Sequence, residues 1–459
     1  MIHRYQKKGL NFVLDVNSGA VHLLDDISYA VSGLLDENMG DTCPQSIIDA
    51  LPDYTADEIR EAYGELYELK KAGQLFAQDD YIDVSRYIPV NAPVKALCLH
   101  VAHDCNLRCQ YCFASTGDFG QGRKIMPPEV AKKAIDFVIA RSGKRRNIEV
   151  DFFGGEPLMA WDTVTQTVDY ARSLEEKYNK KFRFTITTNG LLLDEDKRKY
   201  INENMDNCVL SLDGRREVND EFRKTVAGTG SYDTIVPKFK ALVDERDPNL
   251  DYYARGTFTS HNLDFAEDVL SIADAGFDRL SVEPVTADPG CGYDLTEDDL
   301  PKIEAEYDRL TDIMLERKKE GKPFTFFHFM VDLDQGPCVV KRLRGCGAGY
   351  EYVAVTPDGD IYPCHQFVGK DEFKQGSVLD QSFNMDIAQK FAGMNIYSRP
   401  KCQKCWAKFY CSGGCSAANY NMNHDMNDSY DLGCEMERKR LECAIYLKAM
   451  DKICANQSK

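Results

Sequence analysis

Between about residue 95 and residue 335, segments with strand character alternate with segments with helix character. Strands separated by helices of about 10–15 residues are typical of βαβ units, which build a parallel sheet. Six strand segments predict a partial (β/α)6 barrel, an α/β fold in which functional residues follow the carboxyl ends of the strands. The expected strands are 95–103, 148–153, 182–188, 209–213, 252–259 and 280–285, and the expected helices are 128–141, 161–178, 195–203, 232–244, 263–275 and 297–320.

Two regions of different character flank the predicted barrel. Residues 1–85 begin with a β-hairpin whose turn is Asn17-Ser-Gly-Ala, followed by expected helices at 27–35, 46–50 and 55–72. Thr55 and Glu58 form a capping box at the start of the third helix, and Gly73 ends it. After residue 337 short strands and loops dominate until a helix at 435–452. The expected domains are therefore 1–85, 95–335 and 338–459.

The composition restricts the partners and the compartment. A net charge of −18 on 459 residues argues against nucleic acid as the main partner, because a phosphate backbone calls for a basic face. No apolar run approaches the roughly 18 residues that cross a bilayer, and the first residues do not resemble a signal peptide. The sequence therefore predicts a cytoplasmic protein that binds no membrane. In that reducing compartment, the 17 cysteines are expected to be metal or cluster ligands.

The first group of cysteines is Cys105, Cys109 and Cys112, a CxxxCxxC motif at the end of the first barrel strand. A [4Fe–4S] cluster normally takes four thiolates, so three cysteines would leave one iron free to bind something else. The alternative is a structural zinc site. Zinc tetrads usually contain CxxC pairs, and the three-residue first gap therefore counts against zinc.

With Tyr111 directly before its last cysteine, this motif resembles that of the radical S-adenosylmethionine (SAM) enzymes. The resemblance implies that the open iron binds the amino and carboxylate groups of SAM. It also implies reductive cleavage of SAM to a 5′-deoxyadenosyl radical, which abstracts a hydrogen atom from the substrate. Cys105, Cys109 and Cys112 would then be catalytic as well as metal-binding.

The resemblance extends to motifs at the ends of later strands. Gly154-Gly155-Glu156-Pro is similar to the family's GGEP motif, whose backbone and glutamate hold the methionine amino group. Tyr111 is expected either to contact adenine or to fill the core. Gly154-Gly155 is alternatively a tight turn, and Ser211 with Asp213 a helix cap. The remaining implied SAM contacts are Asn189 in the Thr187-Thr-Asn-Gly190 segment after the third strand, Ser211 and Asp213 near the ribose and carboxylate, Arg223 at the carboxylate, and Glu283 near the adenine.

The cysteines after residue 337 resemble the SPASM domain that follows some radical SAM domains and carries two auxiliary [4Fe–4S] clusters, which would make three clusters in all. CxxC pairs also suit a zinc ribbon, which is the alternative. By this resemblance, Cys402, Cys405, Cys411 and Cys434 would ligate the distal cluster, and Cys346, Cys364 and Cys415 the proximal one. Cys338 is the candidate fourth proximal ligand; otherwise that iron is open to a substrate thiolate. The other six cysteines are expected to be buried or surface thiols.

Residue 365 differs from a related pattern. Anaerobic sulfatase maturases share this architecture and carry an aspartate base directly after the cysteine that corresponds to Cys364. This chain has His365 there, which places the sulfatase-type reaction in doubt. His365 is expected either to accept a proton or to hydrogen-bond a cluster.

The N-terminal module resembles the winged, PqqD-like recognition domain of peptide-modifying enzymes, in which a leader peptide adds a strand to the sheet. A dimerisation or capping module is the alternative. The start of the chain, Ile2-His-Arg-Tyr followed by the segment from Val13 to His22, closely resembles the maturases of six-cysteine (SCIFF) peptides, which are sactisynthase-like. With the two downstream regions, the resemblance covers nearly the whole chain. That similarity implies thioether formation between cysteine sulfur and carbon in a cysteine-rich precursor, and a low-potential electron donor such as flavodoxin or ferredoxin. The alternatives are another SPASM peptide or protein oxidase and a non-enzymatic iron–sulfur electron carrier.

Overall fold

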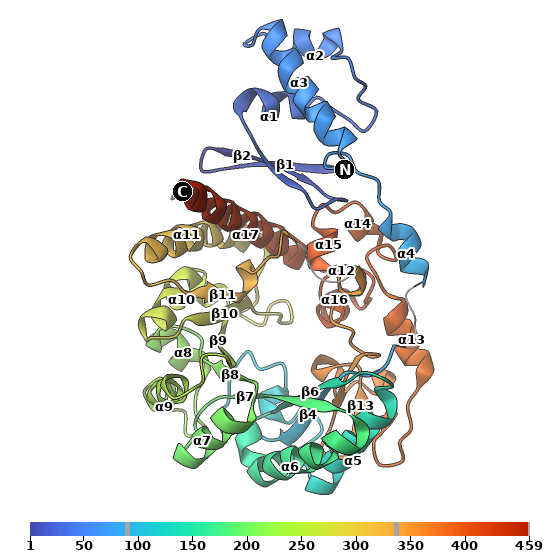
Figure 1. The fold of residues 1–459 in the computed structure, drawn as a ribbon. Helices are drawn as coiled ribbons and strands as arrows, with labels where there is room; N and C mark the ends of the chain where they lie inside the picture. The colour runs from blue at the N-terminus through green and yellow to red at the C-terminus, as the bar shows by residue number, and fades with distance from the viewer. Residues whose placement is uncertain (88–91, 335–338, 458–459) are drawn as a thin grey trace.

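The computed structural model describes residues 1–87, 92–334 and 339–457 of the chain. Figure 1 shows the N-terminal module in blue at the top and the barrel at the bottom. The long C-terminal helix α17 (Asp431–Gln457) runs between them. Among the helices in these ranges, none is both long enough and apolar enough to cross a membrane.

The predicted α/β barrel is confirmed. Six neighbouring strands pair in parallel and occupy the predicted segments to within two residues at either end. They are β4 (Ala96–His103), β6 (Asn147–Gly154), β7 (Lys181–Thr188), β8 (Asn207–Ser211), β9 (Asp251–Phe258) and β10 (Arg279–Pro284). The helices of the barrel are α5 (Pro128–Arg141), α6 (Trp161–Tyr178), α7 (Glu195–Asn204), α8 (Arg216–Phe222), α9 (Tyr232–Asp244), α10 (Phe265–Asp274) and α11 (Leu300–Lys319).

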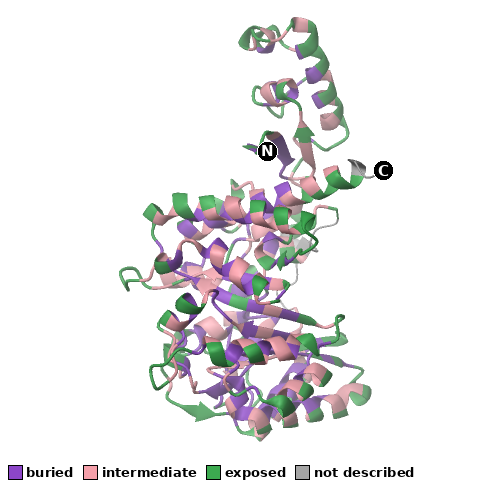
Figure 2. Ribbon diagram, turned by 90° about the vertical axis from the view of Figure 1, so that its left-hand side faces the viewer, coloured by how far each residue is buried: buried purple, intermediate pink, exposed green. Residues whose placement is uncertain are grey.

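Side-chain alternation gives the barrel its core and its interior. On β6, Ile148, Val150 and Phe152 are fully buried in the main hydrophobic core. Since successive strand residues point to opposite faces, Asp151 and Phe153 face the barrel interior. Figure 2 shows the same division, with buried strand residues at the centre and exposed residues on the outer surfaces of the helices.

The C-terminal region extends the barrel sheet, which the sequence did not indicate. Strand β12 (Tyr352–Val355) pairs in parallel with β4, and β13 (Asp360–Tyr362) and β14 (Gly376–Ser377) follow as antiparallel neighbours. The two-residue strands β11 (Thr325–Phe326) and β5 (Lys124–Ile125) pair with β10 and β4. The expected boundary near residue 338 thus divides one continuous sheet. The helices of this region are α12 (Val339–Arg344), α13 (Met385–Gly393), α14 (Pro400–Gln403), α15 (Lys408–Cys411) and α16 (Ser416–Asn423).

The N-terminal module contains the predicted hairpin and helices. Strands β1 (Ile2–Lys7), β2 (Leu10–Asp15) and β3 (Val21–Leu24) form an antiparallel sheet in that order. The capping box of Thr55 and Glu58 is present at the start of the third helix, which ends before Gly73 at a φ of 69°. The helices are α1 (Asp26–Ser32), α2 (Gln45–Ala50), α3 (Ala56–Lys71) and α4 (Tyr81–Tyr87).

The small sheet of this module packs on α17. Tyr5, Phe12 and Leu14 share a buried cluster with Leu441 and Ile445. The His3 ring stacks on Trp406, with the ring centroids 3.8 Å apart. Helix α17 therefore fixes the N-terminal module relative to the cysteine-rich region.

Ile445→Ala should weaken this attachment by about 2–5 kcal/mol, because it empties a fully buried site between two elements. The measurement is the urea midpoint followed by Trp406 fluorescence in a Trp161→Phe background, since these are the two tryptophans of the chain. Lys448→Ala, at an exposed position of the same helix, is the control and should change stability by less than about 0.5 kcal/mol. Equal midpoints for the two variants would contradict the packing described.

Candidate cofactor and cluster sites

The loop that carries Cys105 lies against the end of β6. A Cβ atom at Gly155 would lie 2.1 Å from the Asp104 carbonyl oxygen, and one at Gly154 would lie 2.2 Å from that of Ala102. Gly154 also has a φ of 126°, which side chains other than glycine rarely tolerate. The glycine pair is therefore required for the close approach of the two strand ends.

Glu156 organises the next part of the site. Its buried carboxylate accepts hydrogen bonds from the Leu158 amide (3.0 Å), the Thr188 hydroxyl (2.7 Å) and the Asn189 amide (2.8 Å). Asn189 Nδ2 in turn donates to Asn106 Oδ1 at 2.8 Å and lies 3.5 Å from Cys105 Sγ. Glu156 thus positions Asn189 against the cysteine loop. Burial raises the pKa of Glu156, and the hydrogen bonds from Asn189 and Thr188 oppose that shift.

Asp213, Tyr111 and Arg223 form a second buried group. The Tyr111 hydroxyl donates to Asp213 Oδ2 at 2.6 Å and accepts from Arg223 Nη1 at 2.8 Å, and Arg223 Nη1 lies 3.7 Å from Asp213. Within the described residues, nothing accepts a hydrogen bond from the buried Arg223 Nε. A buried guanidinium nitrogen without an acceptor suits an anionic ligand such as the SAM carboxylate.

The three cysteines of the first motif fit an iron–sulfur cluster. Burial, followed by the negative charge of Glu156, raises the pKa of Cys105 to about 12. Burial raises that of Cys109 to about 11, which nearby Arg223 opposes. Thiolates that crowd one another in a buried loop are stabilised by a cationic iron centre, as cluster ligation requires. These residues would hold a cluster whose open iron binds SAM.

Glu283, the residue expected near the adenine, forms contacts with two side chains of the protein. Arg255 Nη2 donates to Glu283 Oε2 at 2.6 Å, and His328 Nε2 lies 3.9 Å from Glu283 Oε1. Ser211 is registered with Arg255 on the neighbouring strand. Strand alternation would have placed Arg255 inside the barrel, and Thr188 belongs to the segment that contains Asn189, whereas no sequence signal marked the roles of His328 and Asn106.

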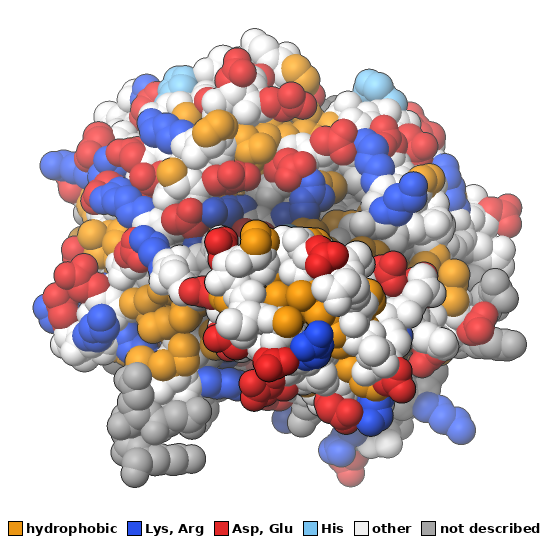
Figure 3. Space-filling model, turned by 90° about the horizontal axis from the view of Figure 1, so that it is seen from above, with side chains coloured by type: hydrophobic (Ala, Val, Ile, Leu, Met, Phe, Trp, Pro, Cys, Tyr) orange, Lys and Arg blue, Asp and Glu red, His pale blue; other side chains and the backbone are white. Residues whose placement is uncertain are grey.

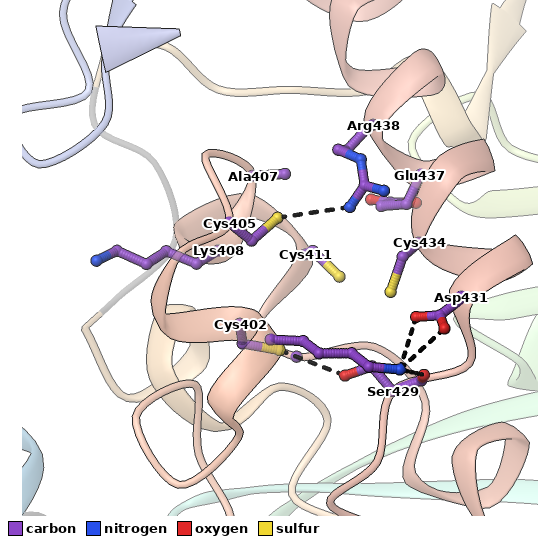
Figure 4. A pocket seen from close by; sticks show the side chains of 12 residues that line it. Cys402, Cys405, Ala407, Lys408, Cys411, Ser429, Asp431, Cys434, Glu437 and Arg438 are labelled. Atoms are coloured by element: carbon purple, nitrogen blue, oxygen red, sulfur yellow. Dashed lines mark hydrogen bonds and ion pairs between the residues drawn. The ribbon is translucent and has the colours of Figure 1, made fainter. Parts of the chain in front are cut away.

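The four cysteines expected to ligate the distal cluster line one cavity of about 220 Å³. Figure 4 shows the sulfur atoms of Cys402, Cys405, Cys411 and Cys434 directed into this space from separate elements. Ser429 Oγ lies 3.5 Å from Cys402 Sγ, and Arg438 Nη1 lies 3.9 Å from Cys405 Sγ. In the described chain, no three His, Cys, Asp or Glu side chains converge on a position for a single metal ion. Four sulfurs around a cavity fit a cluster of several irons.

The three cysteines expected to ligate the proximal cluster lie close enough for their charges to interact with one another; they are Cys346, Cys364 and Cys415. Burial raises the pKa of Cys364, and the charges of Cys415 and then Cys346 add to the shift. Cys415 also lines a cavity of about 310 Å³ that reaches Pro284 at the end of β10. Cys338, the candidate fourth ligand, lies outside the described residues.

His365 directly follows Cys364 and packs between aromatic rings. Its ring centroid lies 5.1 Å from that of Phe153 and 5.5 Å from that of Phe113. Burial lowers the pKa of His365 to about 4, so the ring is neutral at pH 7. The Tyr352 hydroxyl lies 3.4 Å from Nδ1. A neutral imidazole can accept a proton or form a hydrogen bond to a cluster, so it is compatible with both expectations from the sequence.

The cysteines outside the two arrays match the expectation of buried or surface thiols. Cys98, Cys208 and Cys443 are buried, Cys43 is partly buried, and Cys291 and Cys454 are exposed. Exposed Cys291 thus provides a cysteine that can be replaced without opening a cavity.

Cys434→Ala should lower the iron and sulfide content by about one cluster, because it removes one of four sulfurs around the distal cavity. The measurement is iron and sulfide analysis after anaerobic reconstitution, with electron paramagnetic resonance of the reduced protein. Cys291→Ala is the matched control and should bind as much iron as the wild type. Unchanged iron in Cys434→Ala would exclude this residue as a ligand.

Glu156→Gln should weaken SAM binding about tenfold or more. The glutamine amide nitrogen would face one of three buried donors, which costs about 1–3 kcal/mol and displaces Asn189. Equilibrium dialysis of reconstituted protein with labelled SAM measures the effect, and exposed Glu129→Gln is the control. Wild-type affinity in Glu156→Gln would show that the carboxylate does not organise the site.

Comparison with known proteins supports the two cluster regions. Residues 99–251 match the radical SAM superfamily, and residues 346–406 match the SPASM iron–sulfur cluster-binding domain. The chain is 25% identical over 350 residues to the cysteine-type anaerobic sulfatase-maturating enzyme of Clostridium novyi, covering 72% of this chain and 90% of that enzyme.

Two solved structures share the fold. That of anSMEcpe with bound AdoMet and the Kp18Cys peptide is 21% identical, covers 78% of this chain and 99% of its own, and has a TM-score of 0.64. Streptococcus suis SuiB bound to its precursor peptide SuiA is 18% identical, with coverages of 94% and 98% and a TM-score of 0.54. This chain therefore combines a radical SAM domain, indicating SAM and [4Fe–4S] clusters, with a SPASM domain.

Proposed function

We propose that this chain is a radical SAM peptide maturase that installs thioether bonds between cysteine sulfur and carbon in a cysteine-rich precursor peptide. The observation that carries the proposal is the position of the cysteines after two strands of one sheet that are separated by a single strand, β12. Cys105 follows β4, whereas Cys364 follows β13, the strand after β12, which pairs with β4. A substrate in the barrel interior would reach both groups.

The chain's own residues hold and orient the reacting groups. SAM bound at the first cluster would supply the radical that removes a hydrogen atom, and the proximal cluster would accept the remaining electron. Asn189, anchored by Glu156, and Arg223, with its free Nε, would orient SAM. Cys338 or the substrate thiolate would complete the proximal cluster, and flavodoxin or ferredoxin would supply electrons.

The N-terminal module would bind the leader peptide. The outer edge of β3 has no neighbouring strand within the described residues, so its backbone groups are available to an added strand. Leu23 of β3 is 43% exposed and offers an apolar contact. From above, this module presents hydrophobic side chains among interspersed acidic and basic ones (Figure 3). A dimerisation module remains the alternative, distinguished by the effect of a leader on oligomeric state.

A second candidate is another SPASM peptide or protein oxidase, favoured by the similarity to a sulfatase-maturating enzyme. His365 counts against that reaction, because it stands where the related pattern has an aspartate base. The enclosure of its ring by Phe113 and Phe153 also separates it from bulk water. Thioether formation therefore remains the proposed activity.

Reduced, reconstituted enzyme with SAM and the cysteine-rich precursor should yield a peptide that is lighter by two hydrogens for each bridge. The bridged peptide should also carry fewer alkylatable thiols, because each bond consumes one cysteine. Mass spectrometry before and after alkylation checks this, and tandem spectra locate the acceptor residue. Cys105→Ala is the control and should form no bridge.

The other outcomes separate the candidates. Deoxyadenosine production without loss of thiols would contradict thioether formation and favour a different oxidase. An absence of SAM cleavage, with intact clusters that accept electrons, would favour an electron carrier instead.

A further inference from the structure

Asp151 is an acidic residue on the interior face of the barrel, and it is not among the residues assigned to SAM or to a cluster. Asp151 is the central member of a line on the interior face of β6, between Glu149 and Phe153. Its neighbours on the adjoining strands are Cys98 of β4 and Thr185 of β7, which are paired with it in register. A carboxyl group among such uncharged neighbours requires an explanation, because burial of a charge is costly.

The surroundings of Asp151 connect it to the proximal cluster region. Tyr352, on β12, faces the same interior. It lies close enough to Asp151 and Cys364 for their negative charges to add to the rise that burial causes in its pKa. The Tyr352 hydroxyl lies 3.4 Å from His365 Nδ1, and the His365 ring packs on Phe153, two residues along β6 from Asp151. Tyr352, His365 and Phe153 therefore link the surroundings of Asp151 to Cys364.

The charges around Asp151 suit a group that exchanges a proton near neutrality. Burial raises the pKa of Asp151 to about 7, the negative charge of Glu149 adds to the shift, and a hydrogen bond with Thr185 opposes it. The other titratable groups that face it, Cys98 and Tyr352, also have pKa values raised by burial and stay neutral. A carboxyl poised at the working pH is an effective general base.

The amino end of the same strand face is exposed to solvent. Glu149 lies two residues before Asp151 on this face of β6 and is exposed. Arg183 of β7 is registered beside Glu149 and is 48% exposed, so this end of the interior is open to water.

We propose that Asp151 is the proton acceptor of the reaction and takes the proton of the donor cysteine thiol of the peptide. This inference rests on the proposed thioether function. It assigns proton acceptance to a residue of the barrel, a role for which the sequence had suggested His365 as a candidate.

The assignment completes the balance of the bond-forming step. The acceptor C–H bond breaks and its hydrogen atom goes to the SAM-derived radical. The S–H bond breaks heterolytically and its proton goes to the Asp151 carboxylate. The S–C bond then forms, and the one remaining electron goes to an oxidised iron–sulfur cluster, the one-electron acceptor.

Asp151→Asn should retain deoxyadenosine formation and slow thioether formation by about 10²-fold or more, since general bases contribute about 10²–10⁴-fold. The wild-type rate should rise as pH increases through about 7, because the base acts when deprotonated, and the variant should lose that inflection. Asp136→Asn, on the exposed face of α5, is the matched control and should behave as the wild type.

Infrared spectra of the holoenzyme give a reading independent of turnover. The wild type should show a protonated carboxyl band that disappears as pH rises through about 7, and Asp151→Asn should lack it. Thioether formation by Asp151→Asn at the wild-type rate, or the absence of that band from the wild type, would overturn the proposal. A wild type that forms no thioether would overturn the proposed function together with this proposal. Thioether formation by Asp151→Asn at the wild-type rate would overturn this proposal alone, so the two failures are distinguishable.

Discussion

The parallel pairing of β12 with β4 is the constraint on which both parts of the site depend. Cys105 follows the end of β4, and on its other side β4 pairs with β6, which ends at Gly154. The register of β12 places Ala354 beside Cys98, and β13 then leads to Cys364. A slip of one residue would turn every β12 side chain to the opposite face. The distance between the two groups of cysteines is thus set by backbone hydrogen bonds of one sheet.

Polar groups around the barrel rim are satisfied mainly by one another. Arg215 binds Asp264 through both terminal nitrogens and Asp268 through Nε. Glu156 accepts three hydrogen bonds, whereas Arg223 retains one unused donor. Fully satisfied networks hold a framework rigid, and a residual donor is free for a ligand. The rim therefore combines fixed supports with a small number of groups available to a substrate or cofactor.

The barrel could be predicted from sequence because its signal is repeated and long. Strands β6, β7, β8 and β9 carry alternating burial, and periodic helices separate the strands, so errors at one element do not alter the fold. The seven-residue helix α8 was missed, since a short polar segment has no such period. Strand β12 was also missed. It has four residues, which is too short for a period, and its pairing with β4 joins Tyr352 to Ala96, a partner far away in the sequence.

Only those candidate site residues could be predicted whose spacing along the sequence is set by the group that they would bind. Cluster ligands recur at fixed separations because several must reach one inorganic group, and Cys402, Cys405, Cys411 and Cys434 indeed surround one cavity. Asp151 has no such spacing, since its character comes from burial and from Glu149 on the same strand face. The pKa of a carboxyl group depends on what the fold packs around it. The cysteines proposed as cluster ligands could therefore be identified from their spacing, whereas the environment of Asp151 could be recognised only in the folded structure.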